Sequence, residues 1–195
     1  MKFENEVTVE IDMELSKLKK YLSDLGFQER EEYDLNDIYM VNKNIEHNND
    51  PLTILSNCIL IRHIIEKDKE KKQITYKYKE YDDNGDIIKQ GKVDCVIDSI
   101  EQAKTLFENL GYEEIITLND HLIVYANDFD EFALQNVNDK HLYIEVEEHC
   151  NFIDRHYNNN EEMKEVFTKY NIPIKNDDYF VKKAAIEIKE TLSDK

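Results

Sequence analysis

Polar and apolar residues alternate without a break over residues 6–12, close to the start of the chain. Successive side chains of a β-strand point to opposite faces, so this pattern predicts a strand whose buried side carries Val7, Val9 and Ile11. Further strand-like segments follow along the chain at residues 28–42, 57–66, 72–81, 86–98, 113–126, 129–137 and 141–149. About eight strands, mostly joined by short connections, predict an antiparallel sheet.

Apolar residues at helical spacing interrupt the strands. Residues 13–25 and 100–110 each carry an apolar stripe and are followed by a glycine, Gly26 or Gly111, at which a helix can end. Two more helices are expected over residues 161–171 and 178–192, separated by Pro173. Residues 83–86 (Asp-Asn-Gly-Asp) are typical of a hairpin turn. The sequence therefore predicts an α+β fold with helices packed outside the sheet.

A strand–helix–glycine unit occurs twice in the chain. The segments VEIDMELSKLKKYLSDLGFQE and CVIDSIEQAKTLFENLGYEE share Ile-Asp near their start and Leu-Gly-aromatic near their end. We interpret this similarity as an internal duplication. A single domain over residues 1–195 is expected, built from two related halves at about 1–90 and 91–195.

The overall charge and the cysteines exclude several classes of partner and location. A formal net charge of −18 repels nucleic acid and anionic membrane surfaces, so neither is an expected partner. No apolar run approaches the ~18 residues that a membrane span needs, and the N-terminus lacks the apolar core of a signal peptide. The three cysteines, Cys58, Cys95 and Cys150, are far apart and suggest no disulfide framework. A cytoplasmic protein is expected.

Charged residues are sorted by strand on the polar faces of the predicted sheet. Carboxylates lie on the first and last strands and cations on the middle ones, namely Glu4, Glu6, Glu145 and Glu147 against Arg62, Lys77, Lys79 and Lys92. For a single strand, such alternation usually means a sheet with one wet side. Closing the sheet would instead turn the carboxylates toward the cations. Carboxylate oxygens suit Mg²⁺ or Mn²⁺, and lysine and arginine suit the phosphate oxygens that the metal bridges.

Any phosphate site in this chain must be built from side chains. The sequence has four glycines and contains neither GxxxxGK[ST] nor GxGxxG. No serine or cysteine pairs convincingly with a base, so covalent catalysis is not predicted. His149, Cys150 and His156 have no recognisable metal-ligand spacing and are assigned no role.

Over nearly its full length the chain resembles the CYTH family, which includes class IV adenylate cyclases and thiamine triphosphatases. The resemblance rests on the order and spacing of Glu4-Asn5-Glu6-Val7-Thr8, Leu25-Gly26-Phe27, Asp37-Ile38-Tyr39, Ile59-Leu60-Ile61-Arg62, Ile74-Thr75-Tyr76-Lys77 and Tyr143–Glu147. It implies an eight-stranded antiparallel closed β-barrel, or tunnel, that binds a triphosphate. The expected phosphate ligands are Arg62, Lys77 and Lys92, with Lys79 as an extra cation on the face of Lys77 and His121 as a donor when it is protonated. The implied ligands of Mg²⁺ or Mn²⁺ are Glu4, Glu6, Glu145 and Glu147.

The chain departs from the family pattern at several of the implied ligands. Thr8 replaces the lysine that closes the first motif, and Leu60 replaces an arginine. The motif R-x-E-x-E reads Lys92-x-Asp94-x-Val96. Where the family has a K-x-R pair, this chain has Asn119 and His121, and where the family has an acidic residue, this chain has Gln135. Each charge-assisted hydrogen bond to phosphate contributes on the order of 1.5–3 kcal/mol, so these changes weaken triphosphate binding unless other residues compensate.

Three functions remain open from the sequence. The first is a metal-dependent phosphohydrolase that acts on inorganic triphosphate, thiamine triphosphate or a nucleotide, or an adenylate cyclase-like enzyme. The second is a catalytically degenerate tunnel that binds an anion, a nucleotide or a protein partner without turnover. The third is a structural acidic domain that acts through its C-terminal helices. The sequence leaves open whether the protein is a monomer or a homodimer.

Overall fold

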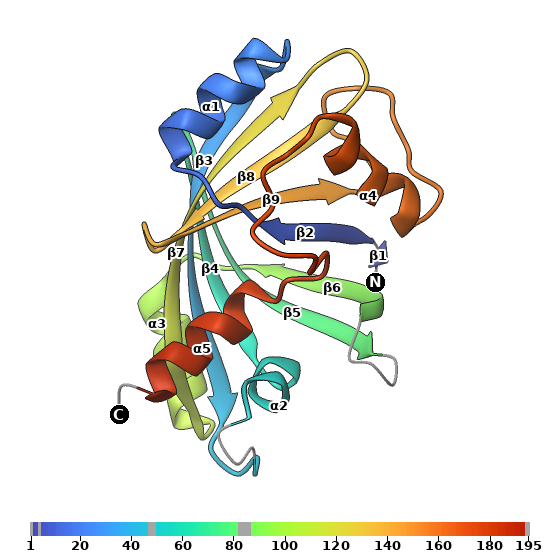
Figure 1. The fold of residues 1–195 in the computed structure, drawn as a ribbon. Helices are drawn as coiled ribbons and strands as arrows, with labels where there is room; N and C mark the ends of the chain where they lie inside the picture. The colour runs from blue at the N-terminus through green and yellow to red at the C-terminus, as the bar shows by residue number, and fades with distance from the viewer. Residues whose placement is uncertain (1, 4, 47–49, 82–86, 194–195) are drawn as a thin grey trace. The chain divides into compact units, whose positions relative to one another are not determined.

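The computed structural model describes residues 2–3, 5–46, 50–81 and 87–193 (Figure 1). The strands are β1 (Lys2–Phe3), β2 (Glu6–Glu10), β3 (Gln28–Asn42), β4 (Ile59–Glu66), β5 (Glu70–Tyr81), β6 (Ile87–Val96), β7 (Tyr112–Ala126), β8 (Glu131–Val137) and β9 (His141–Glu147). The helices are α1 (Leu15–Asp24), α2 (Pro51–Ser56), α3 (Ile100–Asn109), α4 (Asn160–Lys169) and α5 (Lys183–Ser193). The predicted hairpin turn at residues 83–86 lies outside the described residues.

The strands form a sheet in the order β1-β6-β5-β4-β3-β7-β8-β9-β2. The N-terminal strand is split, because β1 pairs with β6 whereas β2 pairs with β9, both antiparallel. The neighbouring pairs β4–β5, β5–β6, β7–β8 and β8–β9 are antiparallel as well. With β1 and β2 counted as one strand, the eight antiparallel strands and the α+β class predicted from the alternation are confirmed.

One helix was not expected from the sequence. Helix α2 begins at Pro51, and the carboxylate of Asp50 accepts a hydrogen bond from the backbone N–H of Thr53 over 2.8 Å. Proline at the first helical position and an acidic N-cap favour a helix start. None of the helices in the described ranges is long and apolar enough to cross a membrane.

The described chain divides into two compact units. The first unit comprises Met1–Phe3, Asp34–Asn119 and Lys182–Lys195, and the second comprises Glu4–Tyr33 and Asp120–Val181. Each unit therefore takes residues from both of the predicted halves. The repeated strand–helix unit appears once in each, as β2–α1 in the second and β6–α3 in the first.

The two copies end their helices in the same way. Gly26 after α1 has φ 87°, and Gly111 after α3 has φ 86°. This left-handed conformation suits glycine, which has no Cβ to clash with the following carbonyl. The shared cap agrees with the proposed duplication, which stays a prediction.

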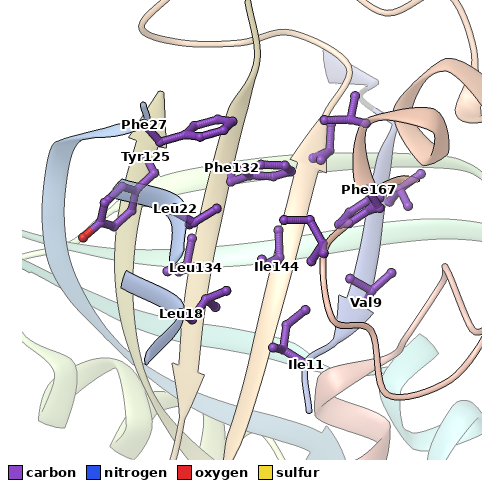
Figure 2. Packing of buried hydrophobic residues seen from close by; sticks show 14 of the residues in the cluster. Val9, Ile11, Leu18, Leu22, Phe27, Tyr125, Phe132, Leu134, Ile144 and Phe167 are labelled. Atoms are coloured by element: carbon purple, nitrogen blue, oxygen red, sulfur yellow. The ribbon is translucent and has the colours of Figure 1, made fainter. Parts of the chain in front are cut away.

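The core of the second unit lies on the apolar face of β2, β7, β8 and β9. Val7 and Val9 are fully buried there. Figure 2 shows Phe132 and Ile144 beside Phe167 in this cluster. Rings of Phe27 and Phe132 lie 5.0 Å apart between centroids. Each fully buried side chain of this size contributes about 1.5–3 kcal/mol, so the alternation seen in the sequence supplies much of the stability of this unit.

The first unit has apolar clusters on both faces of its strands. Leu60 packs with Ile54 of α2 and with Ala184 and Ile188 of α5. Its neighbour in the chain, Ile61, points to the other face and belongs to the cluster that includes Ala103 of α3. The face of Leu60 is therefore partly covered by helices and partly left to the polar residues described below.

The free edge of β2 is covered by the chain between Pro173 and Val181. Thr8 donates its backbone N–H to the carbonyl of Tyr179, and Val181 donates to the carbonyl of Thr8, each over 3.1 Å. An unpaired strand edge is a template for aggregation. The C-terminal segment removes that edge within the second unit.

Asp130 anchors α4 to the start of β8. Its carboxylate is 1% exposed and accepts hydrogen bonds from Tyr157 (2.9 Å), Tyr170 (2.8 Å) and Lys169 (2.6 Å). Burial raises the pKa of this carboxyl, but the bonds from Lys169 and the two tyrosines outweigh burial and lower the pKa below its ordinary value of 3.8. The carboxylate therefore stabilises the fold in its charged form.

Replacing Asp130 by asparagine is expected to lower the free energy of unfolding by about 2 kcal/mol at pH 7, because three hydrogen bonds lose a charged acceptor. Because the pKa of Asp130 is lower in the folded state, its charged carboxylate stabilises the fold above pH 3.8. This stabilisation is lost as the pH falls through the folded-state pKa. The difference in the free energy of unfolding between wild type and Asp130→Asn, measured by urea unfolding, should be smaller at pH 3.5 than at pH 7. Asp128→Asn, at an exposed position, serves as the control. An equal gap at both pH values would contradict this account.

Candidate functional site

Carboxylates gather on the polar face of β2 and β9 in the second unit. Glu6 lies directly opposite Glu147 in the antiparallel register, and Thr8 lies opposite Glu145. These residues share one face, since they alternate with Val7, Val9, Ile144 and Val146 of the core. Three of the four predicted metal ligands are thus brought together. The fourth, Glu4, lies outside the described residues.

Glu145 is held by two of the residues that depart from the family pattern. Its side chain is 7% exposed, and its Oε2 accepts hydrogen bonds from Thr8 (3.3 Å) and from the Gln135 amide (3.1 Å). The resemblance implied a lysine at position 8 and an acidic residue at position 135. Thr8 and Gln135 are neutral, and both donate a hydrogen bond to Glu145. Glu145 is therefore held without a charged side chain at position 8 or 135.

Glu10 lies on the same face but is engaged within the fold. It accepts hydrogen bonds from Lys175 (2.8 Å) and from a ring nitrogen of His141 (3.1 Å). Burial raises the pKa of Glu10, but these two partners outweigh burial and lower it. Glu10 is therefore a structural ion-pair member at the far end of the carboxylate face.

The carboxylate face fits a divalent oxygen-seeking metal. Like charges directly opposite each other on neighbouring strands repel, and Glu6 and Glu147 form such a pair. Mg²⁺ is usually held by one or two carboxylates and completes its shell with water and substrate phosphate. Glu6, Glu145 and Glu147 supply oxygen ligands of that kind on one face, but their ligand atoms do not all lie within 4.8 Å of one another.

Cations gather on a polar face of the first unit. Lys77 of β5 lies directly opposite Lys92 of β6 in the register. Arg62 of β4 lies opposite Gln73, which shares a face with Lys77 because the two are four residues apart on β5. Lys79 also has this parity, but its side chain is outside the described part of the chain.

Arg62 is partly neutralised by Asp37 of β3. The Nε of Arg62 donates to one oxygen of Asp37 over 2.7 Å, and a terminal nitrogen donates to the other. The Asp37 side chain is 8% exposed and that of Arg62 16% exposed. A bidentate pair of this kind is strong and directional. Asp37 belongs to the Asp37-Ile38-Tyr39 motif, but its pairing with Arg62 could not be predicted from the sequence.

Leu60 explains one missing cation. It replaces a family arginine, has 2% exposure, and packs with Ile54 and Ile188 in the apolar cluster beneath α2 and α5. A charged head at this position would be removed from water without a partner. Leu60, which stands in place of the family arginine, is therefore a core residue in this chain.

A buried polar cluster continues the cationic face. Thr75 donates to an oxygen of Asp94 over 2.7 Å, and the Gln73 amide donates to the same oxygen over 3.0 Å. Gln73 is 4% exposed, and its Oε1 has no hydrogen-bond partner among the described residues. A buried acceptor left unpaired is costly, and a water molecule or a ligand that donates a hydrogen bond would satisfy it.

His121 does not lie on the face of Glu145. It shares the parity of Ile123 and Tyr125, which belong to the core on the opposite face, and its Nε2 lies 3.2 Å from Glu32. Asn119 has the same parity on β7 and lines a hollow of about 370 Å³ at the start of α3, with His63, Lys72 and Glu101. The K-x-R positions of the resemblance therefore contribute no cation to the polar face of β7.

Two of the cysteine thiols are unsuited to nucleophilic chemistry. Burial raises the pKa of Cys58 to about 12, and burial with nearby Glu131 raises that of Cys150 to about 12. The thiolate is the reactive form of cysteine, and it is negligibly populated at neutral pH in both residues.

Comparison with known sequences finds no matching protein-family model and no matching curated protein. Comparison with solved structures finds the same fold at low identity. A protein from Pyrococcus horikoshii OT3 matches with a TM-score of 0.63 and 13% identity, covering 87% of this chain and 92% of that chain.

Two further matches have names that mention an activity. A candidate adenylate cyclase from Vibrio parahaemolyticus matches with a TM-score of 0.57 and 12% identity, covering 98% of both chains. A candidate adenylyl cyclase from Hippeastrum, described as having a dominant triphosphatase activity, matches with a TM-score of 0.57 and 12% identity over 94% of both chains. The chain is thus a divergent member of the CYTH fold, as the resemblance of its motifs predicted.

Removing one partner of the Asp37–Arg62 pair is expected to be strongly destabilising. Asp37→Ala leaves a largely buried guanidinium without its carboxylate and should cost about 3–5 kcal/mol in the free energy of unfolding. Arg62→Ala should cost a similar amount, and the double variant less than the sum. A double-mutant cycle by urea unfolding measures the coupling, with exposed Asp34→Ala as the control. Additive losses would show that the two side chains do not act as a pair.

Proposed function

We propose that this protein binds a triphosphate compound with a divalent metal and hydrolyses it. The observation that carries the proposal is the separation of charge between two polar faces. Glu6, Glu145 and Glu147 share one face of the second unit, and Lys77 and Lys92 share one face of the first. A chain with a net charge of −18 gains little general attraction for anions, so a local set of cations is needed to bind one.

The proposal includes closure of the sheet into a tunnel. The two terminal strands of the sheet order, β1 and β2, come from a single N-terminal segment. In addition, solved structures with the CYTH fold match nearly the whole chain. Closure would turn the carboxylate face and the cationic face toward a common interior, as the sorted charges of the sequence suggest.

In the proposed site each group of residues has one task. Glu6, Glu145 and Glu147 would hold Mg²⁺ or Mn²⁺, which neutralises phosphate charge when it is bound. Lys77 and Lys92 bind non-bridging phosphate oxygens. During hydrolysis a water oxygen attacks the terminal phosphorus and the bond to the bridging oxygen breaks, so negative charge develops on the leaving phosphate. The same lysines stabilise that charge.

Gln73 favours a substrate with an organic part. Its buried Oε1 lies on the cationic face and accepts from no described residue. Inorganic triphosphate carries no strong hydrogen-bond donor at neutral pH, whereas a nucleotide carries hydroxyl and amino groups and thiamine triphosphate an amino group. A donor of this kind would satisfy Gln73. Hydrolysis and cyclisation of a nucleotide both remain compatible with the site, and hydrolysis is the reaction proposed.

The second candidate function is binding of an anion, a nucleotide or a partner without turnover. Two observations favour it. Leu60 has joined an apolar core where the family pattern has an arginine, and Arg62 already forms a bidentate pair with Asp37. Both weaken the cationic side relative to the carboxylate side.

Purified protein with Mg²⁺ or Mn²⁺ is expected to release phosphate or pyrophosphate from ATP, thiamine triphosphate or tripolyphosphate. Glu6→Gln and Lys77→Ala should each reduce turnover by about 100-fold or more, since each removes a charged group that is expected to contact metal or phosphate. Detection of phosphate, pyrophosphate and cyclic AMP in the same assay identifies the reaction.

Exposed Glu108→Gln and Lys20→Ala change the same residue types on helices and should leave turnover unchanged. Turnover that survives both Glu6→Gln and Lys77→Ala would show that the site lies elsewhere. A thermal shift with triphosphate but no product supports the binding function instead. Neither product nor shift would remove the hydrolase and the triphosphate-binding function.

A further inference from the structure

A histidine pair forms on the surface of the second unit, outside the carboxylate face. His149 and His156 follow β9 and pair with each other in an isolated antiparallel bridge. Their rings stack with centroids 4.3 Å apart and planes 17° from parallel. Both residues are exposed. Their separation in the sequence gave no sign of this pairing.

The segment that carries the pair is fixed at its base and at its tip. At the base, the Tyr157 N–H donates to the Glu148 carbonyl over 2.9 Å, and the hydroxyl of the fully buried Tyr157 donates to the Asp130 carboxylate over 2.9 Å. At the tip, the carboxylate of Glu131 accepts from the backbone N–H groups of Asn151 (2.9 Å) and Phe152 (2.8 Å). The two imidazoles are therefore presented by a rigid platform.

Glu148 completes a set of three metal-ligating side chains. One of its oxygens lies 3.6 Å from Nε2 of His149. One ligand atom from each of Glu148, His149 and His156 lies within 4.8 Å of the other two. The second oxygen of Glu148 accepts from the Asn5 side chain over 2.8 Å, and such outer contacts orient a ligating carboxylate.

We propose that Glu148, His149 and His156 form a transition-metal site that binds Zn²⁺. Two imidazole nitrogens and one carboxylate oxygen match a ligand set common in zinc sites, with a fourth position left for water. Imidazole selects zinc and similar metals over Mg²⁺, which prefers oxygen ligands alone. The site therefore differs in chemistry from the carboxylate face and does not depend on the proposed triphosphatase function.

Zinc at this site would tie together the two ends of the segment between β9 and α4. The metal binds the folded arrangement and not the separated residues of an unfolded chain, so it stabilises the folded state. The negative net charge raises the local concentration of divalent cations near the surface.

The test is calorimetric titration of the full chain with ZnCl₂ in the presence of excess Mg²⁺. One Zn²⁺ per chain is expected to bind, and Co²⁺ in its place should give a visible absorption band typical of four-coordinate nitrogen and oxygen ligation. His149→Ala and His156→Ala should each weaken binding by at least about tenfold. Both residues are exposed, so both variants should fold, and circular dichroism checks this.

Two control variants test whether zinc binds at this site and not at other histidines or carboxylates. His63→Ala removes a histidine that pairs with Glu70 and should leave zinc binding unchanged. Glu6→Gln disables the proposed Mg²⁺ site and should also leave it unchanged. Zinc should raise the melting temperature of wild type but not of His149→Ala. Absence of zinc binding, or binding that is equal in wild type and both His149→Ala and His156→Ala, would overturn the proposal.

Discussion

The pairing of β2 with β9 is the constraint on which the second unit depends. Because side chains alternate along a strand, a slip of one residue would exchange the two faces of β2. Val7 and Val9 would then meet water, and the glutamates would enter the core. The register Glu6↔Glu147 thus sets the hydrophobic core and the carboxylate face at once. One pairing decides stability and chemistry together.

Polar residues around the carboxylates and the cations show how this chain has diverged. Thr8 and Gln135 give neutral hydrogen bonds to Glu145, while Asp37 binds Arg62. The substitutions at positions 8 and 135 keep Glu145 oriented by neutral hydrogen bonds, and the pair with Asp37 holds Arg62 in place.

The faces of the strands could be predicted from the sequence, whereas most partners could not. Parity is a local property, so the side on which Glu6, Glu145 and Lys77 lie followed from alternation alone. The side on which His121 lies could not be derived in this way, because the register of a long strand cannot be read from a weakly alternating segment. The pairing of His149 with His156 depends on a turn held by Glu131 and Tyr157, which are remote from the pattern around the histidines.

The edge cover of β2 has a consequence for how the protein is made. β2 is synthesised well before its partners on either side, β9 and the segment that ends at Val181; Thr8 and Glu145 are separated by 137 residues. Such long-range contacts form slowly. Until those segments are synthesised β2 has neither neighbour, so both of its edges are open to pairing with another chain.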